Sequence, residues 1–156
     1  MSVLKVGDKA PLFTLENQRG EKVRLSGFKG KSVVIYFYPK ADTPGCTTQS
    51  CALRDAGDDF AGLDAVVIGI SPDAPSRLLK FDDKYTLGFE LLADEDHTVA
   101  EAWGVWGEKS MYGKKYMGII RSAFVVDPKG KLSGVFYKVS PKDTVGNVTK
   151  ALESGH

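Results

Sequence analysis

The sequence predicts a mixed α/β fold: a central mixed β-sheet flanked by helices, with a β-hairpin at the N-terminus. Two apolar runs, residues 32–38 and 65–70, are rich in β-branched and aromatic residues and are typical of strands buried on both faces. A helical pattern follows each run. Strands that alternate with helices, and then a hairpin and a last helix, predict a sheet layered between helices.

The first elements are predicted from alternation and from proline. Apolar and polar residues alternate over 12–25 on both sides of a turn sequence at 17–20, which predicts the N-terminal hairpin. The first apolar run should end at Pro39, because proline has no N–H to donate to a neighbouring strand. A helix is expected from about 44–60, where apolar residues recur every seven positions and place Cys46 on the inward face.

The second half continues this order. Ser71-Pro72-Asp73, at the end of the second apolar run, is expected to cap a helix over 74–85. The further elements expected are a short strand at 89–93, a short helix at 96–103, a long loop at 104–118, a hairpin formed by 122–126 and 132–137, and a closing helix through Leu152. A thioredoxin-like α/β sandwich has this order, and other α/β folds share the pattern.

Composition and charge limit the function. The 156 residues have the length of one domain, so a single domain over 1–156 is expected. Lys and Arg total 21 against 20 for Asp and Glu, so the net charge of +1 offers no field for nucleic acid or an anionic membrane. No run approaches the roughly 18 apolar residues that span a bilayer, and no secretory h-region opens the chain. We expect a cytoplasmic protein with a small or neutral partner.

The two cysteines carry the chemistry to be explained. In a reducing compartment they make no disulfide framework, so they are inert and buried or take part in redox or metal chemistry. Structural zinc takes four ligands, and the chain offers only two cysteines and two histidines. We therefore expect neither a metal nor a cofactor.

The residues before Cys46 form a helix start. Thr43 is a favoured N-cap residue and Pro44 suits the first helical position, which makes Cys46 the third residue of the helix. The side-chain oxygen of Thr43 should then be directed at the backbone N–H of Cys46. Free N–H groups and the positive end of the helix dipole stabilise a thiolate, the reactive form of cysteine. The pattern favours a reactive thiol over an inert buried one.

Cys51 lies five residues after Cys46. In an intact helix the two Cα atoms would be about 8.7 Å apart, from the helix radius and rise, whereas a disulfide needs less than roughly 7 Å. The thiols therefore never join, or they join only when the first turns unwind. Thr47, Thr48 and Ser50 are weak helix formers, which makes unwinding cheap. The residues alone support an inert Cys51 and a redox partner equally well.

The combination Pro39-x-x-x-Thr43-x-x-Cys46 resembles the active-site motif of the peroxiredoxins, and residues 38–55 resemble the bacterioferritin comigratory protein (PrxQ) subfamily in particular. Other stretches similar to that subfamily are 81–85, 111–116 and 118–127, so the resemblance covers nearly the whole chain. It implies a thioredoxin-like fold and a thiol-dependent peroxidase that reduces hydrogen peroxide and alkyl hydroperoxides.

The resemblance also implies roles for individual residues. Cys46 would be the peroxidatic cysteine, which attacks the terminal oxygen of a peroxide and becomes a sulfenic acid. Thr43 would hydrogen-bond the thiolate and the peroxide, and Pro39 would shield the sulfur from water. Arg121 would hold the thiolate and the substrate oxygens, where charge develops during attack. The implied substrate site comprises Thr43, Gly45, Cys46 and Arg121.

Cys51 stands where one branch of the subfamily has its resolving cysteine. The resemblance implies an intramolecular disulfide between Cys46 and Cys51, which thioredoxin, or alternatively a glutaredoxin, would reduce. We expect a monomer, with a weak dimer as the alternative. Two positions depart from the family pattern: Gln49 replaces the Glu of many relatives and Ala123 replaces their Thr.

The alternative from a different class is a non-catalytic redox switch or partner-binding module with a thioredoxin-like fold. In such a protein Cys46 and Cys51 only sense oxidation. A disulfide reductase is disfavoured because the chain has no Cys-x-x-Cys. Peroxide consumption separates an enzyme from a switch.

Overall fold

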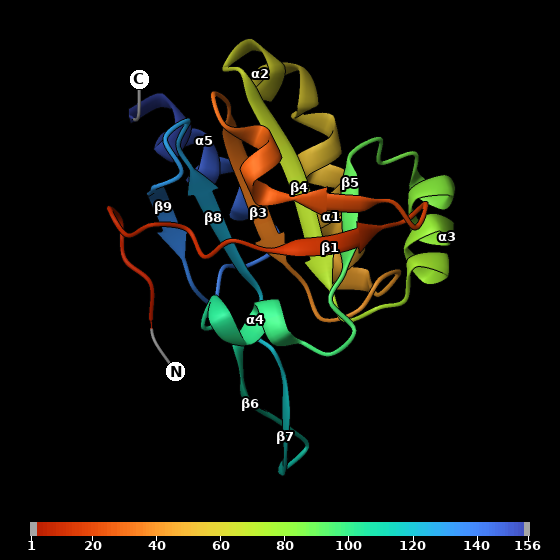
Figure 1. The fold of residues 1–156 in the computed structure, drawn as a ribbon. Coiled ribbons are helices and arrows are strands. Elements are labelled where there is room, and N and C mark those ends of the chain that lie inside the picture. The colour runs from red at the N-terminus through yellow and green to blue at the C-terminus, as the bar shows by residue number, and fades with distance from the viewer. Residues whose placement is uncertain (1–2, 155–156) are drawn as a thin grey trace.

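A seven-stranded mixed sheet forms the centre of the fold in a computed structural model that describes residues 3–154 (Figure 1). Its strand order is β2-β1-β5-β4-β3-β8-β9. The strands are β1 (Thr14–Asn17), β2 (Lys22–Arg24), β3 (Ser32–Phe37), β4 (Ala65–Ser71), β5 (Glu90–Ala93), β8 (Ser122–Val126) and β9 (Leu132–Phe136). The predicted mixed sheet, its N-terminal hairpin β1–β2 and the β8–β9 hairpin are confirmed.

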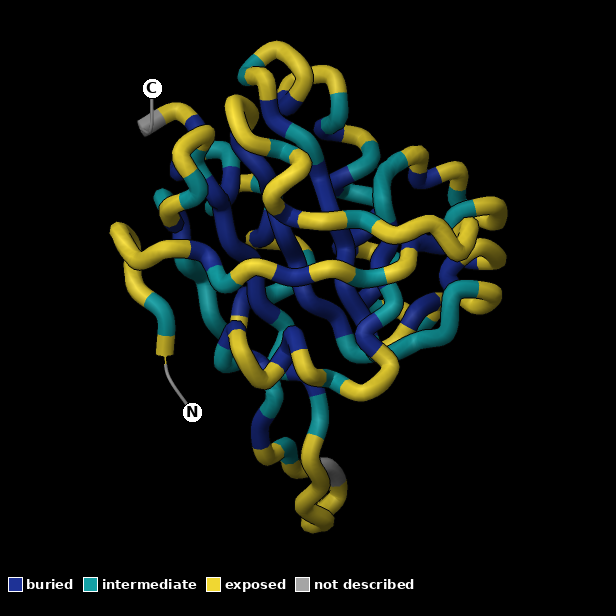
Figure 2. The backbone as a smooth tube through the Cα atoms, in the orientation of Figure 1, coloured by how far each residue is buried: buried dark blue, intermediate teal, exposed yellow. Residues whose placement is uncertain are grey.

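Helices cover both faces of this sheet (Figure 1). They are η1 (Leu25–Phe28), α1 (Pro44–Asp55), α2 (Gly57–Gly62), α3 (Pro75–Tyr85), α4 (Thr98–Ala102) and α5 (Thr144–Ser154). α1, α2, α3 and α5 bury side chains against Val34 and Tyr36 of β3, while α4 packs on the side of Val33 and Ile35. Figure 2 shows β3 and β4 mostly buried, as their apolar runs predict: β3 is buried at every residue, and β4 at every residue except Val66.

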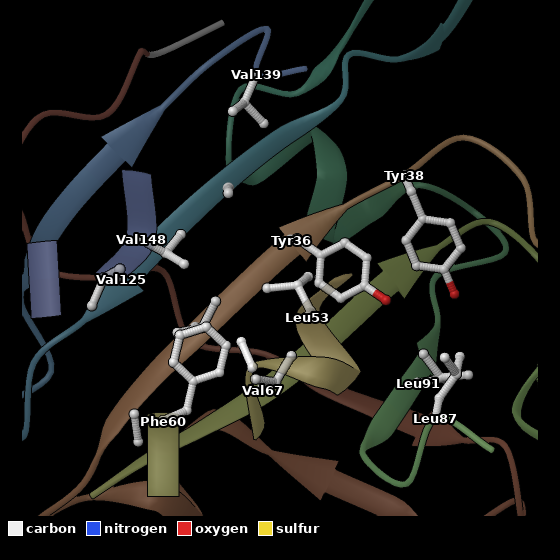
Figure 3. Close-up of a cluster of buried hydrophobic side chains, with 14 of the residues drawn as sticks. Tyr36, Tyr38, Leu53, Phe60, Val67, Leu87, Leu91, Val125, Val139 and Val148 are labelled. Atoms are coloured by element: carbon white, nitrogen blue, oxygen red, sulfur yellow. The ribbon is translucent and has the colours of Figure 1, made fainter. Parts of the chain in front are cut away.

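The first of these two cores contains two stacked tyrosines. Tyr36 and Tyr38 project from the same face of the chain at the end of β3, with ring centroids 5.2 Å apart (Figure 3). Leu53 of α1 and Phe60 of α2 pack in the same cluster. The helix that carries the two cysteines is therefore attached to the sheet by aromatic and aliphatic contacts.

The register of β3 brings two distant segments together. Phe37 pairs with Ile70 of parallel β4 and with Ser122 of antiparallel β8. The chain that leaves β3 toward α1 and the residue that precedes β8, Arg121, therefore meet at one end of the sheet.

The helix predicted to continue to Phe60 is two helices, so that prediction was wrong in its continuity. α1 ends at Asp55 and α2 begins at Gly57, with Ala56 between them at φ −86° and ψ 4°. Leu53 and Phe60 are both fully buried, so the seven-residue spacing is kept across the break. Glycine is a poor helix former, which is consistent with a break at this point.

The long loop predicted over 104–118 was also wrong. Most of it is an antiparallel hairpin of β6 (Trp106–Met111) and β7 (Lys114–Ile119) that projects from the body of the protein (Figure 1). Tyr112 and Gly113 form its two-residue turn with φ values of 54° and 77°. A type I′ turn needs positive φ at both positions, and tyrosine rarely supplies it, so the turn escaped prediction.

The predicted cap of α3 is absent. Ala74 is the N-cap residue, and it makes no side-chain cap hydrogen bond. The carboxylate of Asp73 instead accepts hydrogen bonds from the backbone N–H of Ala41 at 2.7 Å and from the hydroxyl of Ser71 at 2.8 Å. Asp73 thereby ties the segment before α1 to the end of β4.

Candidate active site

Cys46 lies in the first turn of α1, and its side chain is fully buried. Pro44 occupies the start of the helix, as predicted, and the N–H of Thr47 bonds to the carbonyl of Thr43 at 2.8 Å to close the turn. The thiol is free. It therefore lies at the positive end of the helix dipole, close to N–H groups that have no partner within the helix.

Arg121, directly before β8, reaches this thiol at the end of the sheet where β3 leads toward α1. Its Nη2 donates a hydrogen bond to Sγ of Cys46 at 3.3 Å. A hydrogen bond from a charged group is stronger than a neutral one, and a guanidinium on sulfur favours the thiolate. The structure thus brings together two of the residues that the sequence singled out.

A buried relay fixes the orientation of the guanidinium. Nη1 of Arg121 donates to Oε1 of Gln49 at 2.9 Å, and Nε2 of Gln49 donates to Oγ1 of Thr144 at 3.0 Å. The hydroxyl of Thr144 donates in turn to the carbonyl of Ser140 at 2.9 Å. Gln49 and Thr144 are fully buried, so this relay holds the arginine from within the core.

A side chain at position 45 would occupy space that the guanidinium of Arg121 fills, which favours glycine there. A Cβ at this position would lie 3.0 Å from Nη2 and 3.6 Å from Cζ of Arg121, and 3.6 Å from Cγ of Pro141. The absent side chain lets the guanidinium lie against the first turn of α1, beside Cys46.

The predicted direction of the Thr43 side chain was wrong. Thr43 is the N-cap residue of α1, but its side chain makes no cap hydrogen bond. Oγ1 donates instead to the carbonyl of Lys40 at 2.8 Å. This bond closes a turn before the helix. In this rotamer Oγ1 of Thr43 accepts no hydrogen bond from the N–H of Cys46.

The segment between β3 and α1 is held against α3. Pro39 is half-buried at its start. Asp42 has a φ of 60°, and its carboxylate accepts hydrogen bonds from Nζ of Lys84 at 3.0 Å and from the hydroxyl of Tyr85 at 2.8 Å. These bonds, first of all the one from Lys84, lower the pKa of Asp42. No local pattern around Asp42 predicts this clamp, because Lys84 and Tyr85 lie more than 40 residues away in the chain.

Cys51 is half-buried on the same helix as Cys46, and its thiol is also free. Its neighbour Ser50 is fully buried and shares a 2.7 Å hydrogen bond with the hydroxyl of Tyr36. Both cysteines lie within continuous α1, where a five-residue spacing leaves Cα atoms about 8.7 Å apart. In this conformation the thiols are too far apart to bond.

Metal ligation and membrane insertion find no structural basis in the described part of the chain. Among residues 3–154 no group of three or more His, Cys, Asp or Glu side chains is placed to hold a metal ion. No helix within the same residues is long and apolar enough to cross a bilayer.

The sequence predicts the two residues at the centre of the site, Cys46 and Arg121, but not the residues that hold Arg121 in place. Gln49 was noted only as a departure from a pattern, and Thr144 was not singled out. Neither residue carries a local sequence pattern that points to Cys46, because the contacts arise only when α5 packs on α1.

The position of the thiol defines the class of the protein. A dithiol oxidoreductase would carry Cys-x-x-Cys at the start of the helix after the central strand, whereas this chain has a single thiol with an arginine on its sulfur. On a thioredoxin-like sheet this is a thiol peroxidase. The chain belongs to the AhpC/TSA family, whose sequence pattern matches residues 6–135.

Curated relatives and solved structures agree with this assignment. A protein of Haemophilus influenzae called putative peroxiredoxin bcp is 54% identical over 143 residues, which cover 92% of each chain. Peroxiredoxin Bcp of Bacillus subtilis is 48% identical over 150 residues, 96% of each chain. This chain is thus a peroxidase of the bacterioferritin comigratory protein (PrxQ) type.

Among solved structures, peroxidoxin BcpB of Mycobacterium tuberculosis matches with a TM-score of 0.87 and 34% identity, over 98% of this chain and 99% of that one. A bacterioferritin comigratory protein of Xanthomonas campestris, described for its alkyl peroxide reduction activity, matches with a TM-score of 0.86 and 33% identity. The match covers 92% of this chain and 91% of that one. The thioredoxin-like fold predicted from the sequence is confirmed.

Proposed function

We propose that the protein reduces hydrogen peroxide and alkyl hydroperoxides with Cys46 as the peroxidatic cysteine. The observation that carries the proposal is the 3.3 Å hydrogen bond from Nη2 of Arg121 to Sγ of Cys46. The thiolate attacks the terminal peroxide oxygen, the S–O bond forms and the O–O bond breaks. The departing hydroxide or alkoxide takes a proton from water, and Cys46 is left as a sulfenic acid.

Arg121 is suited to this step because a guanidinium has five N–H donors in one plane. One bond to the sulfur and one to Gln49 leave further N–H groups for the peroxide oxygens, on which negative charge develops. Thr43 donates to Lys40 and keeps lone pairs that can accept a hydrogen bond from a hydroperoxide. In this proposal Pro39 shields the sulfur and Gly45 makes room for the arginine.

The sulfenic acid is resolved by Cys51. Its sulfur attacks Sγ of Cys46, the disulfide forms and the sulfenic oxygen leaves as water. Because intact α1 keeps the thiols apart, the first turns of the helix must unwind in each cycle. Unwinding breaks the buried bond between Ser50 and Tyr36, which sets part of its free-energy cost.

Recycling needs a thiol reductant, for which thioredoxin is the proposed donor and a glutaredoxin the alternative. A compartment that keeps thiols reduced, such as the cytoplasm, fits this cycle. We place the activity in a single domain over residues 1–156, acting as a monomer or a weak dimer. The activity described for the Xanthomonas campestris relative supports alkyl hydroperoxides as substrates.

The test is consumption of hydrogen peroxide and of an alkyl hydroperoxide with thioredoxin, thioredoxin reductase and NADPH. The wild type should be at least a thousandfold faster than Cys46→Ser, which lacks the nucleophile. Equal rates would refute a peroxidatic Cys46. Mass spectrometry after one equivalent of peroxide should show a Cys46–Cys51 disulfide, and a sulfenic acid without this linkage would refute the resolving role.

A further inference from the structure

One lysine of the β6–β7 hairpin differs from the others in its surroundings. Lys114 and Lys115 are exposed, whereas Lys109 is half-buried. Lys109 pairs with Tyr116 across the hairpin. Its Cδ lies 3.2 Å from the point where a Cβ of Gly118 would stand, so the stem of the lysine crosses the bare backbone of Gly118.

That placement directs the lysine toward the base of the hairpin. Gly118 pairs with Gly107, two pairs of residues closer to the body of the protein than Lys109 and Tyr116. β7 ends at Ile119, and Arg121 follows two residues later. The stem of Lys109 therefore runs toward the base of the hairpin, the end from which the chain continues to Arg121, rather than out toward its turn.

Charges at that end of the sheet act on Lys109. Burial, and then the charge of Arg121, lower the pKa of the lysine, while the charge of Cys46 opposes them. In the described part of the chain no salt bridge includes Lys109, and the hairpin acid Glu108 pairs with Lys115 at 3.6 Å. The protein thus keeps a partly buried lysine outside any salt bridge of the described residues, and Arg121 and Cys46 are the charged groups that act on it.

We propose that Lys109 is a second positioning cation of the peroxide site, which lies over Gly118 and adds positive potential at the Cys46 thiolate. This inference rests on the proposed function in taking Cys46 as the reactive thiol. Arg121 acts through a directed hydrogen bond, whereas Lys109 acts through space. Its charge stabilises the thiolate and draws anionic reagents to the sulfur more than neutral ones.

Alkylation of Cys46 tests the charge directly and needs no peroxidase turnover. Both proteins carry Cys51→Ser, which leaves Cys46 as the one thiol; one keeps Lys109 and the other has Lys109→Met. For each protein the rate of alkylation of Cys46 is measured with anionic iodoacetate and with neutral iodoacetamide. We expect Lys109→Met to lower the rate of alkylation by iodoacetate roughly three- to tenfold. This is the effect expected of one charge several ångströms away in a partly aqueous setting. Iodoacetamide should slow less, and the difference between the reagents should shrink at 1 M salt.

Two variants separate charge from structure. Lys109→Arg should restore the preference for iodoacetate, and Lys114→Met, which removes an exposed lysine of the same hairpin, should leave it unchanged. An unchanged iodoacetate rate in Lys109→Met would overturn the inference. So would equal slowing of both reagents in the Met and Arg variants, which would show a structural role alone.

Gly118→Ala gives an independent test. An alanine Cβ would crowd Cδ of Lys109 at 3.2 Å and displace the stem. In a protein that keeps Lys109, Gly118→Ala should lower the ratio of the iodoacetate rate to the iodoacetamide rate. In a protein that already has Lys109→Met, adding Gly118→Ala should leave this ratio unchanged. A further fall in that variant would contradict the proposed path of the side chain. Peroxide consumption by the wild type is measured separately, so failure of the proposed function is distinguishable from failure of this inference.

Discussion

Gly45 and Arg121 share one space, because a Cβ on Gly45 would lie 3.0 Å from Nη2 of Arg121. The same nitrogen donates to Sγ of Cys46. A single methyl group at position 45 would therefore crowd the guanidinium and shift it by a few tenths of an ångström from its place at the sulfur. Alanine is a better helix former than glycine, so such a change would not weaken α1 through its intrinsic preference.

Gly45→Ala should lower kcat/KM for hydrogen peroxide by roughly ten- to hundredfold, somewhat less than removal of a whole donor costs. Steady-state kinetics with thioredoxin measures the change. Gly57→Ala is the matched control, because a Cβ on Gly57 would meet no atom within 4 Å. Wild-type activity in Gly45→Ala would show that the position of the guanidinium is not critical.

Gln49→Leu should cost about 1–3 kcal/mol in the free energy of unfolding, because it removes the acceptor of Nη1 of Arg121 and the donor to the buried hydroxyl of Thr144. The rate with peroxide should also fall, since the arginine loses its anchor. Urea unfolding and kinetics measure the two effects. Thr48→Ala, a change at an exposed neighbour on α1, serves as the control. A Gln49→Leu protein with unchanged stability would contradict the relay.

Tyr36→Phe should speed formation of the Cys46–Cys51 disulfide by a few-fold. The change removes a buried hydrogen bond to Ser50, worth about 1 kcal/mol, that unwinding of α1 must otherwise break. Stopped-flow tryptophan fluorescence after a peroxide pulse follows the step. Tyr38→Phe is the matched control, because in the described part of the chain no hydrogen bond joins the Tyr38 hydroxyl to α1. Equal rates in both variants would refute this part of the unwinding model.

Cys51→Ser should keep one peroxide turnover and stall the recycling by thioredoxin. The variant retains the nucleophile but has no second thiol to form the intramolecular disulfide. A single-turnover burst followed by a slow steady state is the expected trace. Unchanged steady-state activity would count against a resolving role for Cys51.

The Asp42 clamp predicts a dependence of stability on pH. The pKa of Asp42 is lowered in the folded protein, so folding favours its ionised form. Its contribution is complete above the unfolded value of about 3.9 and is lost as the pH falls through the folded value. At pH 6 the free energy of unfolding should therefore be higher for the wild type than for Asp42→Asn. The difference between the two proteins should shrink as the pH falls below about 4. Urea unfolding between pH 3 and pH 7 measures it, and a constant gap would contradict the clamp.

Prediction from sequence succeeded where neighbouring residues decide the structure. The burial of β3 follows from six consecutive apolar and small residues, and the start of α1 follows from the Thr43-Pro44 pair. The position of Cys46 in the first turn follows from that start. These features depend on local patterns, which a sequence displays directly.

Prediction failed where a residue had a choice of partners. Thr43 could bond forward to the helix or backward to Lys40, and only the fold decides between them. The carboxylate of Asp73 was expected to cap α3, but it accepts a hydrogen bond from the backbone N–H of Ala41 instead. The β6–β7 hairpin was missed because its turn places Tyr112 at a positive φ, which its sequence does not suggest.

The pairing of β8 with β3 has a consequence for the newly made chain. The contacts that surround Cys46 join residues 72, 75 and 95 positions apart, through Gln49, Arg121 and Thr144. While the chain is being synthesised, the cysteine exists long before its partners do. The contacts with Arg121 and Gln49 therefore form only when folding is complete, and in the proposed mechanism Cys46 of an immature chain lacks the groups that prepare it for peroxide.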